Sequence, residues 1–220
     1  MQIFDSASKK IHTFNSTEKG NSRQDYHSVL LARTGNTSLV DMNGLVNNQH
    51  LPLIDRALRG YFMMNRANRM GTQEQFVVRL GGILSSAKMR SILVGLRNVT
   101  IIFPNLEDYR ASSADLYRAL SSPQQGLSVD GTYFCVGATK VMHMLFPELF
   151  VMVDKNVGSA CGYSPGQYNN FRAYWKVMMI CHNELKAWTN KYGSINGLLR
   201  LDPLPTSITR VFDKCATVTR

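Results

Sequence analysis

Lys140 and Asp154, a potential nucleophile and a potential acid or base, lie in one segment that spans residues 131–157. The lysine follows Val136-Gly137 near the expected start of a helix, where the helix dipole and apolar surroundings lower the pKa of an amine. The aspartate follows the apolar run 150–153, and a carboxylate in such surroundings needs polar partners. A partly neutral amine can attack a carbon atom, and an oriented carboxylate can activate a water or stabilise positive charge.

Helix boundaries must position these two side chains. Pro147 is expected to end the helix that bears Lys140, because proline cannot continue it, and Asp154 then opens the next helix. Asp154 as a helix cap is compatible with Asp154 as a catalyst. For Lys140 the alternative to a nucleophile is a solvent-facing helix lysine. Glu148 is expected to be solvated, and His143 is either a proton shuttle or a packing histidine, with packing favoured.

Helical periodicity covers most of the remaining chain. Thr72 and Gln75 form a capping box that opens one helix, and Ser164 to Gln167 predict the start of another, whose apolar face runs to Trp188. Apolar spacing predicts further helices near residues 54–62, 89–96, 112–121 and 208–212. We therefore predict an all-α fold: an orthogonal array of about eight to ten helices in two small lobes, with a hairpin at the cleft between them.

The N-terminal part has a different composition. Residues 1–24 are rich in Ser, Asn and Lys, which predicts a segment that is poorly ordered or wrapped over the surface. Residues 26–40 fit either a small hairpin or the ends of two short helices. We find no internal repeat and no low-complexity linker, so residues 25–220 are expected to form a single helical domain.

Charge and composition limit the function classes. A net charge of +10 favours a polyanionic partner such as nucleic acid. No apolar run is long enough for a membrane span, and the first residues do not resemble a secretory signal, so we expect a cytoplasmic, intracellular protein. The four cysteines are widely spread, which predicts buried free thiols, no metal site and no organic cofactor.

Two runs in the segment 131–157 together resemble a known family. Val136-Gly137-Ala138-Thr139-Lys140-Val141, followed by Val151-Met152-Val153-Asp154-Lys155-Asn156-Val157, is similar to the signature of the helix-hairpin-helix DNA glycosylases, which reads roughly G-V-G-T-K-V-A and later V-P-V-D-T-H-V. The resemblance implies that Lys140 is the nucleophile of the bifunctional members and that Asp154 is the carboxylate of the active members. It also implies excision of a damaged or modified base from double-stranded DNA, with AP-lyase activity if the lysine attacks, by a monomer.

The resemblance and the neighbouring residues suggest where DNA would bind. Backbone N–H groups near Val136 and Gly137 would hold a phosphate, and a flipped base would need an aromatic pocket. The candidate DNA-binding residues are Val136, Gly137, Thr139, Lys155, Asn156, Arg172 and Lys176, and the candidate base-pocket residues are Phe134, His143, Tyr163 and Tyr168. Two other functions stay open. One is a non-enzymatic helical DNA- or RNA-binding protein that grips phosphate with the hairpin, and the other is a protein-interaction module with incidental charge.

Overall fold

The computed structural model describes residues 3–17, 26, 28–29, 39–60, 69–164, 167, 169–203 and 206–219. Within these ranges the chain forms ten α-helices and one 3-10 helix, and the β-structure there is limited to an isolated bridge between Val40 and Val46. The predicted all-α fold is confirmed. None of the described helices is long and apolar enough to cross a membrane.

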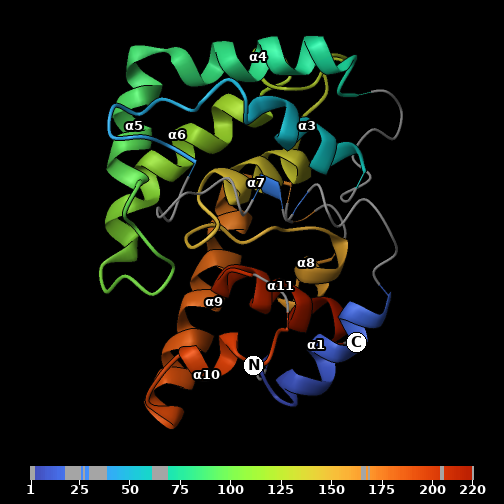
Figure 1. Cartoon of the computed structure of the whole chain (residues 1–220), viewed down its shortest axis with the longest axis vertical. Helices are drawn as coiled ribbons and strands as arrows, with labels where there is room; N and C mark the ends of the chain where they lie inside the picture. Colours follow the sequence, from blue (N-terminus) through green and yellow to red (C-terminus); the bar gives the residue numbers. More distant parts are fainter. Residues whose placement is uncertain are drawn as a thin grey trace.

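Four helices form the upper group in Figure 1 and pack against one another largely in chain order. The 3-10 helix η2 (Leu106–Tyr109) leads into the last of them. The four are α3 (Leu51–Arg59), α4 (Gln73–Ser85), α5 (Ala87–Leu96) and α6 (Arg110–Ser121). Below them lies α7 (Cys135–Leu145), which packs against α6 and α3 and occupies the middle of the molecule.

The lower group gathers around α11 (Ile208–Val218), which packs against three other helices and lies close to the C-terminus. These three are α1 (Ala7–Thr17), α8 (Lys155–Ala160) and α10 (Asn196–Leu199). The longest helix, α9 (Phe171–Tyr192), runs from this group up to α6. The first and last helices of the chain are therefore neighbours.

Local capping sets several helix boundaries. Thr72 and Gln75 form the predicted capping box at the start of α4, and α7 ends at Leu145, two residues before Pro147. The predicted helix start at Ser164 is wrong, because α9 begins at Phe171. There the Asn170 side chain caps the helix by accepting a hydrogen bond from Ala173 N.

The N-terminal segment is packed on the molecule. Ile3 and Ile11 are fully buried, and α1 lies along α11. Of the two alternatives for this segment, residues 3–17 therefore follow the one wrapped over the surface, and not the one with poor order. Most of residues 26–40, for which a small hairpin or the ends of two short helices were expected, lie outside the described residues. Within that stretch, Leu39 N donates to Leu145 O at the end of α7.

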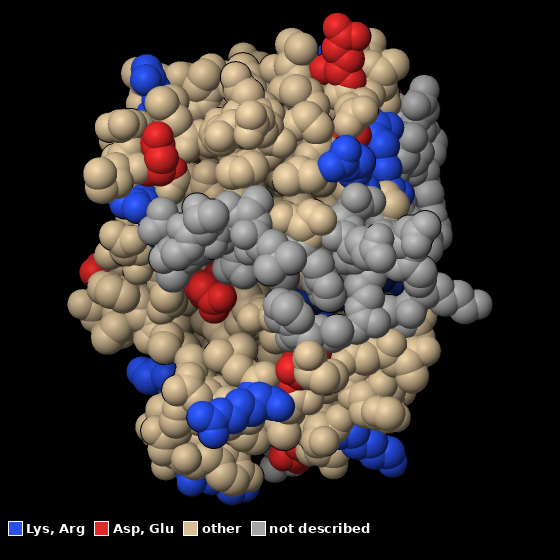
Figure 2. Space-filling model, viewed as in Figure 1, with Lys and Arg blue, Asp and Glu red and all other residues tan. Residues whose placement is uncertain are grey.

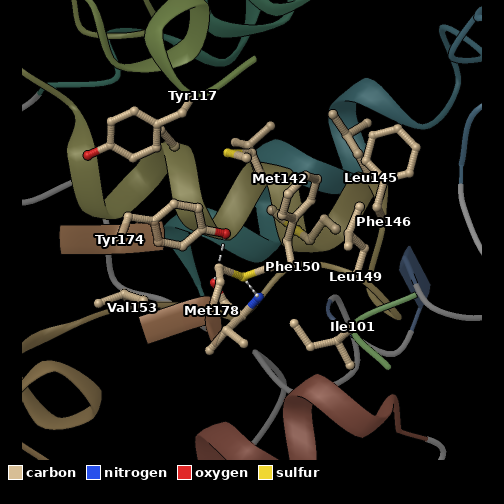
Figure 3. Close-up of a cluster of buried hydrophobic side chains, with 14 of the residues drawn as sticks. Ile101, Tyr117, Met142, Leu145, Phe146, Leu149, Phe150, Val153, Tyr174 and Met178 are labelled. Carbon is tan, nitrogen blue, oxygen red and sulfur yellow. Dashed lines mark hydrogen bonds between the residues drawn. The ribbon is translucent and has the colours of Figure 1, made fainter. Parts of the chain in front are cut away.

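One hydrophobic core extends from α1 to α11. Figure 3 shows its centre, where α7 side chains such as Met142 meet the extended residues that follow Pro147 and two side chains of α9. Tyr174 donates to Val151 O (3.2 Å), and Val151 N contacts the Met178 sulfur (3.3 Å). The extended run 150–153 is thus held between α7 and α9, and it delivers Asp154 to a defined place.

Candidate active site

Helix α7 positions Lys140. Nearly the whole helix is buried, because it crosses the middle of the molecule, and Lys140 is only 7% exposed. Burial lowers the pKa of its amine from 10.5 to about 8. The negative charge of Asp154 opposes this change, and the positive charge of Arg210 adds to it. The solvent-facing lysine is therefore excluded, and the predicted drop in pKa arises mainly from burial.

Asp154 is the N-cap of α8. Its Oδ1 accepts hydrogen bonds from Asn156 N (2.9 Å) and Val157 N (3.1 Å), while the side chain stays partly exposed. Two backbone donors at a helix start hold the carboxylate in one orientation. The predicted cap is present, and it places an oriented negative charge close enough to Lys140 to act on its pKa.

Thr139 joins the two halves of the site. Its hydroxyl donates to Val136 O (2.9 Å) and accepts from Val153 N (3.1 Å), and the side chain is buried. The residue after Val153 is Asp154, and the residue after Thr139 is Lys140. The expectation that Thr139 contacts DNA is therefore wrong, because its hydroxyl is used inside the protein to fix α7 against the segment that carries the aspartate.

Helix α11 brings a further charged pair that the sequence analysis missed. Arg210 and Asp213 form an ion pair on this helix, and both side chains are buried. The Arg210 guanidinium lies over the rings of Phe14 (4.8 Å) and Tyr26 (5.5 Å). An Arg-Asp pair at this spacing is also typical of an exposed helix face, so only its burial under the N-terminal residues distinguishes it.

His143 belongs to the core. It is fully buried, with Nε2 2.6 Å from the Tyr26 hydroxyl and Nδ1 2.8 Å from Phe150 O. Thr209 Oγ1 lies 3.2 Å from the same Nδ1. Because both ring nitrogens have partners inside the protein, the packing alternative holds, and the assignment of His143 to a base pocket is wrong.

The predicted phosphate-binding turn is absent at Val136-Gly137, because both residues lie in the first turn of α7. The connection from α6 to α7 is the thirteen-residue segment 122–134, which is longer than a tight glycine hairpin. Gly137 has a packing reason to be glycine, since a Cβ atom there would overlap the ring of Phe134. An anion could still bind the backbone N–H groups of the first turn of α7, because the first turn of any helix leaves these groups without partners inside the helix.

Phe134 does not line a base pocket. It is 2% exposed and its ring covers Gly137. Tyr163 is half-buried against the core and follows the end of α8, whereas Asp154 caps the start of that helix. Tyr168 lies outside the described residues. Phe134 is therefore excluded from a base pocket, and a role of Tyr163 in one stays a prediction.

The basic candidates divide into two groups. Lys155 is exposed in the first turn of α8, next to Asp154, and Asn156 is half-exposed beside it. Arg172 and Lys176 are exposed on α9, but each lies two residues, or roughly 200° of helix rotation, from Tyr174, whose side chain contacts Val151. Lys176 lies equally far from Met178, the other side chain that contacts Val151. Arg172 and Lys176 thus point away from the segment that leads to Asp154.

Metal-ligand groups and cysteine thiols were the other candidates for a reactive centre among the described residues. They contain no group of three His, Cys, Asp or Glu that could hold a metal ion. All four cysteines are buried and free, as predicted, and burial raises the pKa of the Cys161 and Cys215 thiols to about 12. Such thiols stay protonated at neutral pH and are poor nucleophiles.

Comparison with family models, with curated proteins and with solved structures found no match for this chain.

Proposed function

We propose that this protein is a DNA glycosylase that removes a damaged or modified base, with Lys140 and Asp154 as its catalytic residues. The observation that supports this most is the buried amine, whose pKa is lowered to about 8 and which lies near a carboxylate fixed by two backbone donors. At neutral pH such a pKa raises the neutral, nucleophilic fraction of the amine from roughly 0.03% to roughly 10%.

The reaction follows from these two groups. The neutral Nζ of Lys140 attacks C1′ of the deoxyribose, the bond from C1′ to the base nitrogen breaks, and its electron pair leaves with the base, which takes up a proton. Positive charge develops on the sugar, and the Asp154 carboxylate stabilises it. Loss of a proton from the attached nitrogen and opening of the sugar ring then give a Schiff base, from which the 3′ phosphate can be eliminated. If water attacks in place of the amine, Asp154 accepts its proton and no covalent adduct forms.

Burial of the nucleophile has a consequence for binding. Since Lys140 is 7% exposed, a deoxyribose reaches it only after the side chains that cover it move. Enzymes that close over their substrates commonly couple such a movement to binding. Base removal is therefore expected to need a DNA that offers an unstacked nucleotide, for which the energy of flipping is lowest.

The experiment is base excision on a panel of duplexes, each with one oxidised, alkylated, mismatched or hypermodified base, with borohydride present or absent. The expected result is alkali-sensitive cleavage that is lost in Asp154→Asn, and a reduced covalent adduct that is lost in Lys140→Ala. Lys186→Ala is the matched control, because this lysine is exposed on α9 and is not among the candidate DNA contacts. Cleavage without an adduct would mean that water attacks with the help of Asp154 and that Lys140 is not the nucleophile.

The net charge of +10 favours a second function, a DNA- or RNA-binding protein without catalysis. On the face shown in Figure 2, however, Lys and Arg are scattered among Asp and Glu over the described residues, and they do not gather in one broad patch. Salt-sensitive binding of duplexes, with no base released from any member of the panel and no effect of Asp154→Asn, would establish this function in place of the glycosylase.

A further inference from the structure

A second place in the molecule has the form of a ligand site. A pocket of about 500 Å³ opens where α9 ends and α10 begins, at the lower end of the molecule in Figure 1 and apart from α7. Its wall includes the aromatic rings of Trp188 and Tyr192, the polar side chains of Ser194 and Asn196, and the guanidinium of Arg200. Pockets for small ligands usually measure about 300–1,000 Å³, so one nucleotide-sized molecule fits.

The aromatic wall is formed by residues one helical turn apart. The rings of Trp188 and Tyr192 lie 4.2 Å apart, and a contact with Phe4 (5.9 Å) supports Trp188 from behind. Tyr192 is 55% exposed, even though the Trp188 ring and the Lys191 Nζ lie against its ring. Gly193 then adopts a left-handed conformation (φ 79°), and this turn brings Ser194 to the pocket. The two rings thus present aromatic surface to the pocket.

The charge of the pocket favours an anion. Every residue that lines it is neutral or basic, with Arg200 as the cation, and the Lys191 Nζ lies 4.9 Å from the Tyr192 ring. Asp202, which follows shortly after Arg200, is buried and bonded to Lys214 (2.7 Å). The Asp202 carboxylate is therefore used within the protein. Asp5 lies outside the pocket lining, but after Tyr192 it is among the groups that raise the pKa of the Lys191 amine, so the positive charge of the pocket comes from Arg200.

We infer that this pocket binds a nucleotide, with the base stacked on Tyr192 and the phosphate on Arg200. An aromatic ring next to a cation is the arrangement that proteins use for unpaired nucleotides, because every base offers a flat face and every phosphate a charge. Ser194 and Asn196 supply donors and acceptors for the sugar or the base edge. The buried Nε1 of Trp188 has no acceptor among the described residues, and a base carbonyl would provide one after a small shift of the ring.

The chain contains its own reporter for the test. It has two tryptophans, and Trp175 is buried with its indole N–H bonded to Glu107 (2.8 Å), so a change in fluorescence on binding arises from Trp188. Titration with deoxyadenosine 5′-monophosphate, with deoxyadenosine and with single-stranded oligo(dA) tests the phosphate and the strand separately. We expect saturable quenching by the monophosphate and weaker binding of the nucleoside. If oligo(dA) binds more tightly than the monophosphate, the natural ligand is a nucleotide within a strand. If the two bind equally, the natural ligand is a free nucleotide.

Two substitutions and two matched controls complete the experiment. Tyr192→Ala is expected to weaken binding of the monophosphate by at least about fivefold, the lower end of what one stacked base contributes. Arg200→Gln should reduce its affinity to that of the nucleoside. The controls are Tyr133→Ala, at another exposed tyrosine, and Arg118→Gln, at another exposed arginine, and both should bind as the unchanged protein does.

The inference is overturned if none of the three compounds quenches saturably, or if Tyr192→Ala binds as tightly as its control. Circular dichroism verifies that each variant is folded. Because Lys140 and Asp154 do not line this pocket, the Lys140→Ala and Asp154→Asn proteins should bind nucleotide normally. Failure of the glycosylase proposal and failure of this inference are therefore separate results.

Discussion

Replacement of Lys140 by methionine is expected to stabilise the protein while it abolishes the adduct with DNA. Methionine keeps an unbranched chain of similar length in the buried site, and it removes the charge. The pKa of the amine is 10.5 in an unfolded chain and about 8 in the folded protein, because burial penalises the charged form. That difference corresponds to about 3 kcal/mol of unfolding free energy, at about 1.4 kcal/mol per pKa unit. This is the largest gain expected for Lys140→Met at neutral pH.

The gain must depend on pH in a defined direction. The folded pKa lies below the unfolded one, so between pH 8 and 10.5 the unfolded chain binds a proton that the folded protein does not. The unchanged protein therefore gains stability from this lysine's titration as the pH rises through that window, and below about pH 8 the full penalty applies. Lys140→Met lacks this titration, so its advantage should be greatest near neutral pH and should vanish above pH 10.5.

Urea unfolding, followed by circular dichroism at a series of pH values, measures the difference between the two proteins. Titrating groups that do not interact with Lys140 affect both proteins equally and cancel in that difference. Lys155→Met is the control, because this lysine is exposed in the neighbouring helix and its removal should change stability little at any pH. If Lys140→Met is less stable than the unchanged protein at neutral pH, or if the difference does not vary with pH, then burial does not set the charge state of this amine.

Three further results are expected. Thr139→Val should lower the unfolding free energy by about 1–3 kcal/mol, because it leaves a buried backbone N–H without an acceptor, and Thr139→Ser should restore both stability and base excision. Gly137→Ala should cost about 1–3 kcal/mol through overlap with the neighbouring ring, which a drop in melting temperature would reveal. The pair Arg210→Gln with Asp213→Asn, changed together so that no buried charge is left alone, should raise the pKa of Lys140. The pH midpoint of borohydride trapping should then move upward, and an unchanged midpoint would contradict this reasoning.

Local signals predicted the parts of the site that depend on neighbouring residues. Proline at position 147 accounts for the end of α7, and the apolar run before Asp154 accounts for the start of α8, because both effects act within a few residues. The predicted start of α9 is wrong because local signals alone do not choose between two possible caps. Ser164 and Asn170 are both competent caps, and the choice between them depends on how the helix packs.

Contacts between distant segments could not be predicted from the sequence. The partners of Arg210 include Phe14 and Tyr26, and nothing near Arg210 in sequence indicates them. The polar composition of residues 1–24 also concealed a buried face. Ile3, Ala7 and Ile11 recur at every fourth position, and this spacing was the signal that could have identified α1.

The pairing of α1 with α11 affects the order of events during folding. Asn15 bonds to Asp202 and Lys214 across 187 and 199 positions of the chain, and contacts of such separation form late, because they close the longest loops. Until α1 packs on α11, the charged groups of α11 remain hydrated, so they lose their water only after the rest of the core has formed. Changes in this pairing should therefore accelerate unfolding more than they slow folding. Detachment of α1 alone would also rehydrate the ionic groups of α11 while the upper helices stay folded.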